Sequence, residues 1–255
     1  MAGRAVECGY PACAVTDHGS VSGAFAFTKA CKDVCRCAHM KKSHASGKGR
    51  CLQKGCPCGE FAPAGLKPVL GEEFYVCAKD PSLKSPENRS LTHLCVLAKD
   101  QAGWVALMRA TTDANRHFYY KPRLDLQKLA GWAAGHWIVF SGHPGSDMAN
   151  AVFGDAYRRA YRSTTYEEAR SYVRHDWKTA LPALACRFRD LFGKENFFLE
   201  VQLVDQANMP AALVVALLMR WVGKKTGIPC LATPDAHYAR SPDAVDQRVT
   251  LCSPL

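Results

Sequence analysis

Six short apolar segments, rich in β-branched and aromatic residues, recur along the chain, and helix-like stretches lie between most of them. The segments are residues 13–16, 69–77, 91–98, 137–140, 197–203 and 230–232. Apolar spacing predicts helices at 23–34, 102–115 and 209–225, and one or two more within 166–192. Strands that alternate with helices predict right-handed β-α-β units and a largely parallel sheet, either open or closed as a barrel.

Side chains that bind metals lie within, at or beside the ends of five of these segments. They are His18, Glu73, His93, His143, Asp235 and His237. Imidazole nitrogens and carboxylate oxygens are ligands for Zn²⁺-like or Mn²⁺-like ions, and a carboxylate can bridge two ions. Each residue taken alone is as readily explained as a hydrogen-bonded structural residue. Their shared placement along five strands therefore predicts divalent metal ions at the carboxyl ends of the strands, where barrels of this kind carry their chemistry.

The pair Asp235 and His237 illustrates the reasoning. The two residues are separated by one position, so an extended backbone would place both side chains on the same side. Both side chains could then bind one ion. The alternative is that the two residues form a structural salt bridge. Asp17, which precedes His18, is expected to orient an imidazole rather than to bind an ion.

Composition limits the class of protein. The 255 residues are 48% hydrophobic and 22% charged, which suits one large globular domain with a substantial core. No stretch approaches the roughly 20 apolar residues of a membrane span, and the first residues have no apolar run typical of a signal peptide. We therefore expect a cytoplasmic protein that does not contact a membrane. The odd count of 13 cysteines favours reduced thiols, some of them metal-bound, over a disulfide framework.

The formal net charge of +10 favours a polyanionic partner, and DNA is the expected one. Lys121 and Arg123 are candidates for contact with phosphate. The alternative is that both side chains cap a loop and that the basic surface is merely solvated.

Residues 35–64 interrupt the alternation with a polar, basic and cysteine-rich insertion. Its little apolar content predicts a structural zinc ion in place of a core, with Cys35, Cys37, Cys56 and Cys58 as the preferred ligands. The alternative is a disordered basic loop with free thiols. A further set of basic residues would present a positive edge to nucleic acid or keep the loop soluble: Lys41, Lys42, Lys48, Arg50 and Lys54.

These segments resemble the polymerase-and-histidinol-phosphatase (PHP) domain found at the amino terminus of bacterial DNA polymerase III alpha subunits. The matching text is PACAVTDHG from Pro11, LKPVLGEEFYV from Leu66, LTHLCVLAKD from Leu91, FYYKPR from Phe118, FFLEVQ from Phe197 and IPCLATPDAHY from Ile228. Apart from the insertion, the resemblance covers nearly the whole chain in order.

The resemblance implies an α/β fold, a distorted (β/α)7 PHP barrel with up to three metal ions at its mouth. It implies that Glu73 bridges ions, with His93 and His143 completing one site. His18 and His237 would bind another ion, and Asp235 the remaining one.

The sequence also departs from the family. It contains no His-x-His pair, which the family carries on its first strand, and it begins where the first helix is expected. We therefore expect residues 1–255 to be a PHP-like domain that lacks its first strand and is not followed by the polymerase palm. A reading-frame artefact, a split gene and a real loss of the strand are the open explanations.

Three functions follow from the resemblance. The first is a metal-dependent phosphoesterase of a replicative DNA polymerase, acting as a 3′-5′ exonuclease. The second is a non-catalytic domain that supports the rest of the alpha subunit and docks a proofreading exonuclease subunit. The third is a stand-alone PHP-family phosphatase.

Overall fold

The computed structural model describes residues 1–202 and 208–247 of the chain. Within these ranges six strands form one sheet, in the order β1-β2-β3-β4-β5-β6. The strands are β1 (Ala12–His18), β2 (Lys67–Cys77), β3 (Leu91–Ala98), β4 (Trp137–Ser141), β5 (Phe197–Gln202) and β6 (Cys230–Thr233). Each of the six predicted segments is therefore a strand, although residue 203, the end of the predicted fifth strand, lies outside the described residues.

The direction of the strands differs from the prediction of a largely parallel sheet. β2 pairs with β3 and β3 pairs with β4 in antiparallel fashion, whereas β4 with β5 and β5 with β6 are parallel. The sheet is therefore mixed. The reason is that β3 runs opposite to both of its neighbours, so the β-α-β rule inferred from alternation fails on each side of it.

Helices connect most of the strands. They are α1 (Ala2–Glu7), α2 (Ala24–Lys32), α3 (Gln101–Arg116), α4 (Leu126–Ala133), α5 (Asp147–Phe153), α6 (Tyr157–Ala160), α7 (Tyr166–Ser171), α8 (Trp177–Phe192) and α9 (Pro210–Thr226). Four predicted helical stretches are confirmed, and the stretch at 166–192 holds two helices. The short helices α1, α4, α5 and α6 were not predicted, because one or two turns give too short an apolar period to detect.

The described chain forms two compact units. Of the described residues, unit 1 contains 1–15, 22–70 and 236–247, and unit 2 contains 16–21, 71–202 and 208–235. Strands β1 and β2 contribute residues to both units.

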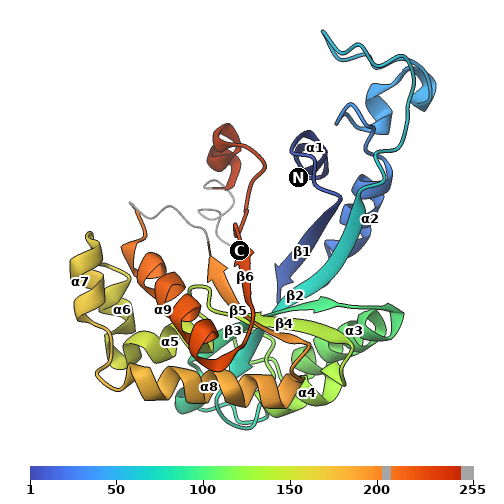
Figure 1. The fold of residues 1–255 in the computed structure, drawn as a ribbon. Helices are drawn as coiled ribbons and strands as arrows, with labels where there is room; N and C mark the ends of the chain where they lie inside the picture. The colour runs from blue at the N-terminus through green and yellow to red at the C-terminus, as the bar shows by residue number, and fades with distance from the viewer. Residues whose placement is uncertain (203–207, 248–255) are drawn as a thin grey trace. The chain divides into compact units, whose positions relative to one another are not determined.

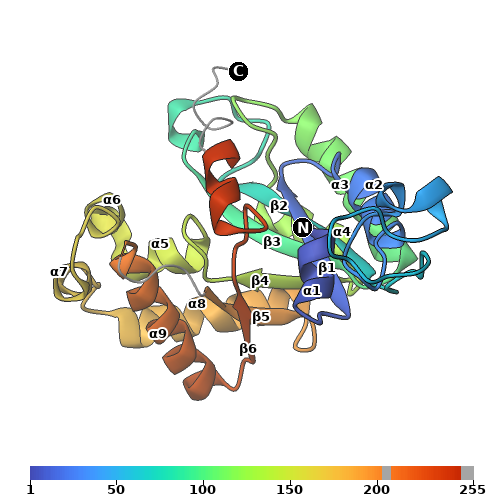
Figure 2. The ribbon, with the colours of Figure 1, turned by 90° about the horizontal axis from the view of Figure 1, so that it is seen from above.

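Unit 2 holds the larger hydrophobic core. Side chains alternate between the two faces of a strand, and the apolar set that includes Phe74, Val96, Val139 and Leu199 is buried. Helices α3, α5, α8 and α9 pack against strands β3 to β5, and Figure 2 shows β3, β4, β5 and β6 following one another across this unit (Figures 1 and 2). The other face of these strands carries the polar side chains of the site described below together with apolar residues such as Phe140.

Unit 1 has a smaller core around α1 and α2. Ala2 and Ala5 pack with Cys31, Val34 and Leu66 in this cluster. The cysteine-rich residues 35–64 belong to this unit. Across the described parts of both units, no helix combines the length and apolar character needed to cross a membrane.

Candidate metal centre

Four side chains from four different elements of unit 2 meet at one carboxylate oxygen. The Oε1 atom of Glu73, in the middle of β2, lies 2.8 Å from Nδ1 of His93 and 3.4 Å from Nε2 of His143. Nδ1 of His18, the last residue of β1, lies 3.6 Å from the same oxygen. His93 belongs to β3, and His143 follows β4 in the loop that leads to α5. Residues far apart in sequence are thus gathered around Glu73.

The strand register explains the gathering. Glu73 pairs with Cys95 and Tyr75 pairs with His93 across the antiparallel β2–β3 ladder, so all four side chains share one face. His93 lies near the start of β3, not near its carboxyl end as the barrel rule predicts. Because β3 is antiparallel to β2 and β4, its beginning is the end that reaches the site.

The neighbouring Glu72 faces the opposite way. It is buried on the helix side of the sheet, where Thr111 of α3 donates a hydrogen bond to its carboxylate. Burial raises the pKa of Glu72 to about 8, although the hydrogen bond from Thr111 opposes this effect. Because side chains alternate along a strand, Glu72 lies on the helix side of the sheet and Glu73 lies on the side of the imidazoles.

His143 is held in place by a second carboxylate. Its Nδ1 atom lies 2.6 Å from Oε2 of Glu200 on β5, and Thr233 of β6 donates to Oε1 of Glu200 at 2.5 Å. Because an ionised carboxylate only accepts hydrogen bonds, Nδ1 carries the proton and Nε2 is turned towards Glu73. This buried Nε2 has no hydrogen-bond partner.

The electrostatics at this point favour a positive charge. Burial would raise the pKa of Glu73, but the neighbouring imidazoles of His143 and His93 outweigh it and hold the pKa well below its usual range. Burial likewise lowers the pKa of His143, but Glu200 and Glu73 beside it raise the pKa to about 10. The position between Glu73 and His143 therefore suits either a proton or a metal ion.

Two overlapping groups of unit 2 have ligand atoms close enough to hold an ion. His18, Glu73 and His93 form one, and Glu73, Cys95 and His143 form the other, with all ligand atoms of a group within 4.8 Å of one another. Nitrogen, oxygen and sulfur donors of this kind suit Zn²⁺ and related ions. The buried Nε2 of His143, which forms no hydrogen bond, is a nitrogen that could bind such an ion. The residues present therefore fit a divalent metal ion, with Glu73 common to both groups.

Asp235 and His237 do not lie on an extended segment. β6 ends at Thr233, and Asp235 has a left-handed backbone with φ of 45°. The alternation argument, which needs an extended strand, therefore fails for this pair. The charge of Asp235 contributes to raising the pKa of the buried Cys95 thiol, mainly an effect of burial, whereas His237 belongs to unit 1. The assignment of both as ligands stays a prediction.

Asp17, predicted to orient an imidazole, does not point the same way as His18. The two residues are consecutive in β1, so their side chains leave opposite faces of the strand. The charge of Asp17 contributes to the raised pKa of Glu72 on the helix side. Whether Asp17 orients another imidazole stays a prediction.

The two candidates for phosphate contact separate. Lys121 is exposed, and its Nζ atom lies 5.3 Å from the centre of the Tyr75 ring, which in turn contacts the rings of His18 and His93. Arg123 is fully buried, donates to the carbonyl of Asn88 and lies over Tyr119. The buried position of Arg123 gives no support to a contact with phosphate, because its guanidinium binds a loop inside unit 2, and that assignment stays a prediction.

Three residues near Glu73 were missed from the sequence: Cys95, Glu200 and Tyr75. Cys95 follows His93 by two positions on a strand, so a shared face was inferable. Glu200 stands in the apolar run FFLEVQ, where an isolated acidic residue is unusual. Tyr75 gave no signal, since an aromatic residue in a strand is ordinary.

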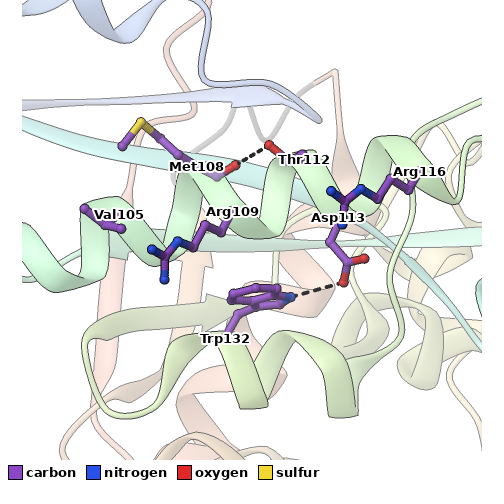
Figure 3. Close-up of a pocket in the computed structure, with 7 residues that line it drawn as sticks. All are labelled: Val105, Met108, Arg109, Thr112, Asp113, Arg116 and Trp132. Atoms are coloured by element: carbon purple, nitrogen blue, oxygen red, sulfur yellow. Dashed lines mark hydrogen bonds between the residues drawn. The ribbon is translucent and has the colours of Figure 1, made fainter.

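A shallow pocket of about 290 Å³ lies elsewhere, on α3 and α4 (Figure 3). Its lining is Val105, Met108, Arg109, Thr112, Asp113, Arg116 and Trp132, and the Trp132 indole donates to Asp113 at 3.2 Å. None of these residues belongs to the Glu73 groups. The volume is at the lower limit for a small-molecule site, so the pocket gives no reason to move the candidate centre away from Glu73.

The cysteines of the insertion fall into two groups within unit 1. Cys35, Cys37 and Cys58 share one group with His44, whereas Cys56 belongs to another that again includes Cys37. The four cysteines predicted to bind one zinc ion are thus divided between two places.

Comparison with known proteins agrees with this picture. The PHP domain family matches residues 1–203. The DNA polymerase III subunit alpha of Helicobacter pylori (strain ATCC 700392 / 26695) is 27% identical over 256 residues, which cover 99% of this chain and 17% of the relative. The subunit of the same name from Treponema pallidum is 30% identical, over 97% of this chain and 17% of the relative. The subunit of the same name from Thermus aquaticus is 29% identical, over 94% of this chain and 16% of the relative. The chain thus spans about one sixth of the length of the curated relatives it matches.

Proposed function

Because the chain belongs to the PHP domain family, we propose that it acts in DNA replication as the PHP domain of a DNA polymerase III alpha protein. We further propose that it hydrolyses phosphodiester bonds at the 3′ end of DNA with bound divalent metal ions. The remainder of an alpha subunit and a proofreading exonuclease subunit are the proposed protein partners, and the cytoplasm is the proposed location. The relatives' names support the replication role.

One observation supports the hydrolytic part above all others. Three imidazoles converge on Glu73, and the buried Nε2 of His143 faces that carboxylate without a hydrogen-bond partner. This nitrogen lies 3.4 Å from Oε1 of Glu73, which is longer than a well-formed hydrogen bond, so an ion bound by both side chains would stabilise the pair. The arrangement is the one expected of side chains that bind a metal ion together.

Different residues would bind the ions, orient a ligand and attract the DNA. Glu73, His93, His18 and His143 would hold the ions, and Glu200 would keep the His143 ring in the tautomer that leaves Nε2 available. A divalent ion in such a site lowers the pKa of a coordinated water and offsets the negative charge that develops on phosphate. Lys121, exposed beside Tyr75, would attract the DNA backbone to the same face.

The test measures nucleotide release from a single-stranded DNA labelled at its 3′ end. We expect release that needs Mn²⁺ or Zn²⁺, stops with a chelator and falls at least 100-fold in His93→Ala. His175→Ala is the matched control, since His175 is an exposed histidine of unit 2 outside both groups. Equal activity in the two variants would contradict the assignment of the site.

A non-catalytic docking role is the second candidate. A protein loaded with metal and joined to the remainder of an alpha subunit, yet inert on DNA while still binding a proofreading subunit, would establish this role. A faster turnover of a phosphomonoester than of DNA would instead favour a stand-alone phosphatase.

A further inference from the structure

A second cluster of metal-binding side chains lies in unit 1, apart from the Glu73 groups in sequence and in composition. Seven cysteines and histidines follow one another with the spacing C-x-C-x-H-x4-H-x6-C-x4-C-x-C. They are Cys35, Cys37, His39, His44, Cys51, Cys56 and Cys58. The two C-x-C pairs at the ends of this run enclose two histidines and one further cysteine.

The fold sorts these seven residues into two groups of four. The first contains Cys35, Cys37, His44 and Cys58, and the second contains Cys37, His39, Cys51 and Cys56. Within each group the ligand atoms all lie within 4.8 Å of one another. Only Cys37 belongs to both. Two four-coordinate ions need eight ligand positions, so seven residues complete both sites when one of them is shared.

Three separations between ligand atoms in these groups match tetrahedral zinc. Zn–S bonds of about 2.3 Å and Zn–N bonds of about 2.0–2.1 Å separate two sulfurs by about 3.8 Å, and a sulfur from a nitrogen by about 3.6 Å. The sulfur atoms of Cys35 and Cys58 are 3.8 Å apart. The Cys37 sulfur lies 3.6 Å from Nε2 of His44, and the Cys51 sulfur lies 3.4 Å from Nδ1 of His39. The 3.8 Å separation also excludes a Cys35–Cys58 disulfide, whose sulfurs would be about 2.05 Å apart.

The surrounding backbone orients the ligands. Nδ1 of His44 lies 2.9 Å from the carbonyl oxygen of Gly49, so Nδ1 carries the proton and Nε2 is free to bind an ion. The amide of Ala62 donates to the Cys35 sulfur at 3.3 Å, as expected for a thiolate acceptor. Backbone hydrogen bonds from Cys35 to His39 and from Cys51 to Cys58 close the two C-x-C pairs onto the rest of the cluster.

The cluster also replaces a core that this segment lacks. Cys35, His44 and Cys51 are buried. Neither hydrophobic core of the described chain includes any residue between 41 and 63. A segment that buries a histidine and cysteines without an apolar core of its own needs another source of stability, and bound metal supplies it in small domains.

We propose that residues 35–58 bind two zinc ions bridged by the thiolate of Cys37. Five thiolates carry five negative charges against the four positive charges of two Zn²⁺ ions, so the cluster bears a net charge of about −1 with neutral histidines. Exposed basic residues on the same segment, which include Lys41, Lys48 and Arg50, offset this charge. The single zinc site with four cysteine ligands is the alternative.

The test uses the full chain loaded with ¹¹³Cd²⁺, which occupies thiolate sites in the manner of zinc and is observed by NMR. We expect two cadmium signals split by mutual coupling, because only a shared ligand transmits coupling between two ions. Signals from ions at the Glu73 groups are identified by Glu73→Gln, which changes or removes them and leaves the coupled pair of the cluster in place. Two uncoupled cluster signals, or a single cluster signal, would overturn the proposal.

Variants sharpen the result. Cys51→Ser removes a ligand of the second group only, so one cadmium signal remains and the coupling disappears. Cys37→Ser perturbs both signals, because it removes the shared ligand. Cys8→Ser is the control, since Cys8 is exposed and outside the cluster, and it leaves both coupled signals in place. Retention of coupling in Cys37→Ser would overturn the proposal even if the count of two ions were correct.

Discussion

Glu200 shows how a residue that need not touch the ion shapes the candidate centre. Its carboxylate lies between His143 and Thr233 and is itself buried. Residues that orient metal-binding histidines commonly change metal affinity by 10–100-fold when they are removed. The orientation of His143 therefore depends on a residue from β5, a strand that none of the predicted ligands occupies.

We predict that Glu200→Ala weakens metal binding by roughly 10–100-fold while the protein stays folded, because the His143 ring loses the partner of its Nδ1. Metal titration followed by calorimetry measures the affinity, and circular dichroism measures the fold. Glu195→Ala, a change at an exposed glutamate just before β5, serves as the control and is expected to bind normally. Equal affinities in the two variants would show that Glu200 does not orient His143.

Glu72 offers a prediction about stability and pH. Burial raises its pKa to about 8 in the folded protein, against about 4.3 for an unfolded glutamate. Between these values the folded state keeps a proton that the unfolded state releases, so this residue makes stability fall as pH rises, by at most about 1.4 kcal/mol per pH unit. The contribution is complete below pH 4 and lost above pH 8.

Glutamine does not titrate, so in Glu72→Gln this residue no longer makes stability fall as pH rises. Urea unfolding between pH 5 and pH 8 should therefore show that the free energy of unfolding depends less on pH than in the unchanged protein. Other titrating groups, His143 among them, contribute to both profiles and cancel in the comparison. Parallel profiles would mean that Glu72 is ionised in the folded protein.

At the scale of elements, the reversed strand β3 determines where the site forms. The connection from β2 to β3 contains no α-helix, whereas α3 and α4 lie between β3 and β4. Apolar composition does not encode the direction of a strand, so alternation with helices predicted parallel neighbours where the structure has antiparallel ones. The same reversal brings His93 and Cys95 to Glu73.

Two helix glycines allow a matched test of packing. A Cβ atom on Gly103 of α3 would lie 2.3 Å from the carbonyl oxygen of His136, whereas one on Gly131 of α4 would meet nothing within 4 Å. We predict that Gly103→Ala destabilises the protein by about 1–3 kcal/mol through overpacking. Gly131→Ala should instead be neutral or stabilise it by up to about 1 kcal/mol, because alanine loses less entropy in a helix. Chemical denaturation measures both, and equal effects would indicate that α3 shifts to make room.

At the scale of the whole molecule, the net charge of +10 predicts DNA binding that weakens with salt. Each phosphate contact with a single strand contributes about 0.7 to the slope of log affinity against log salt concentration. We predict that Lys121→Ala reduces the magnitude of this slope by about 0.7. Lys194→Ala, at an exposed lysine between α8 and β5, should leave it unchanged. Fluorescence anisotropy with labelled DNA at several salt concentrations gives the slopes. An unaltered slope in Lys121→Ala would show that this residue does not contact a DNA phosphate.

The sequence alone determined the strands, most of the long helices and the types of side chain at the candidate centre. It could do so because apolar period and residue chemistry are local properties, visible along a single stretch of chain. Residue chemistry alone identifies Glu73, His93 and His143 as candidate ligands, and their side chains meet in the structure.

Only the tertiary structure decided which residues stand together. It showed that Cys95 and Glu200 join the Glu73 site, that Arg123 is buried, and that the cysteines of the insertion separate into two groups sharing Cys37. The physical reason is that strand direction, register and loop closure arise from contacts between distant segments. No local pattern records which partner a side chain will meet across a sheet or around an ion.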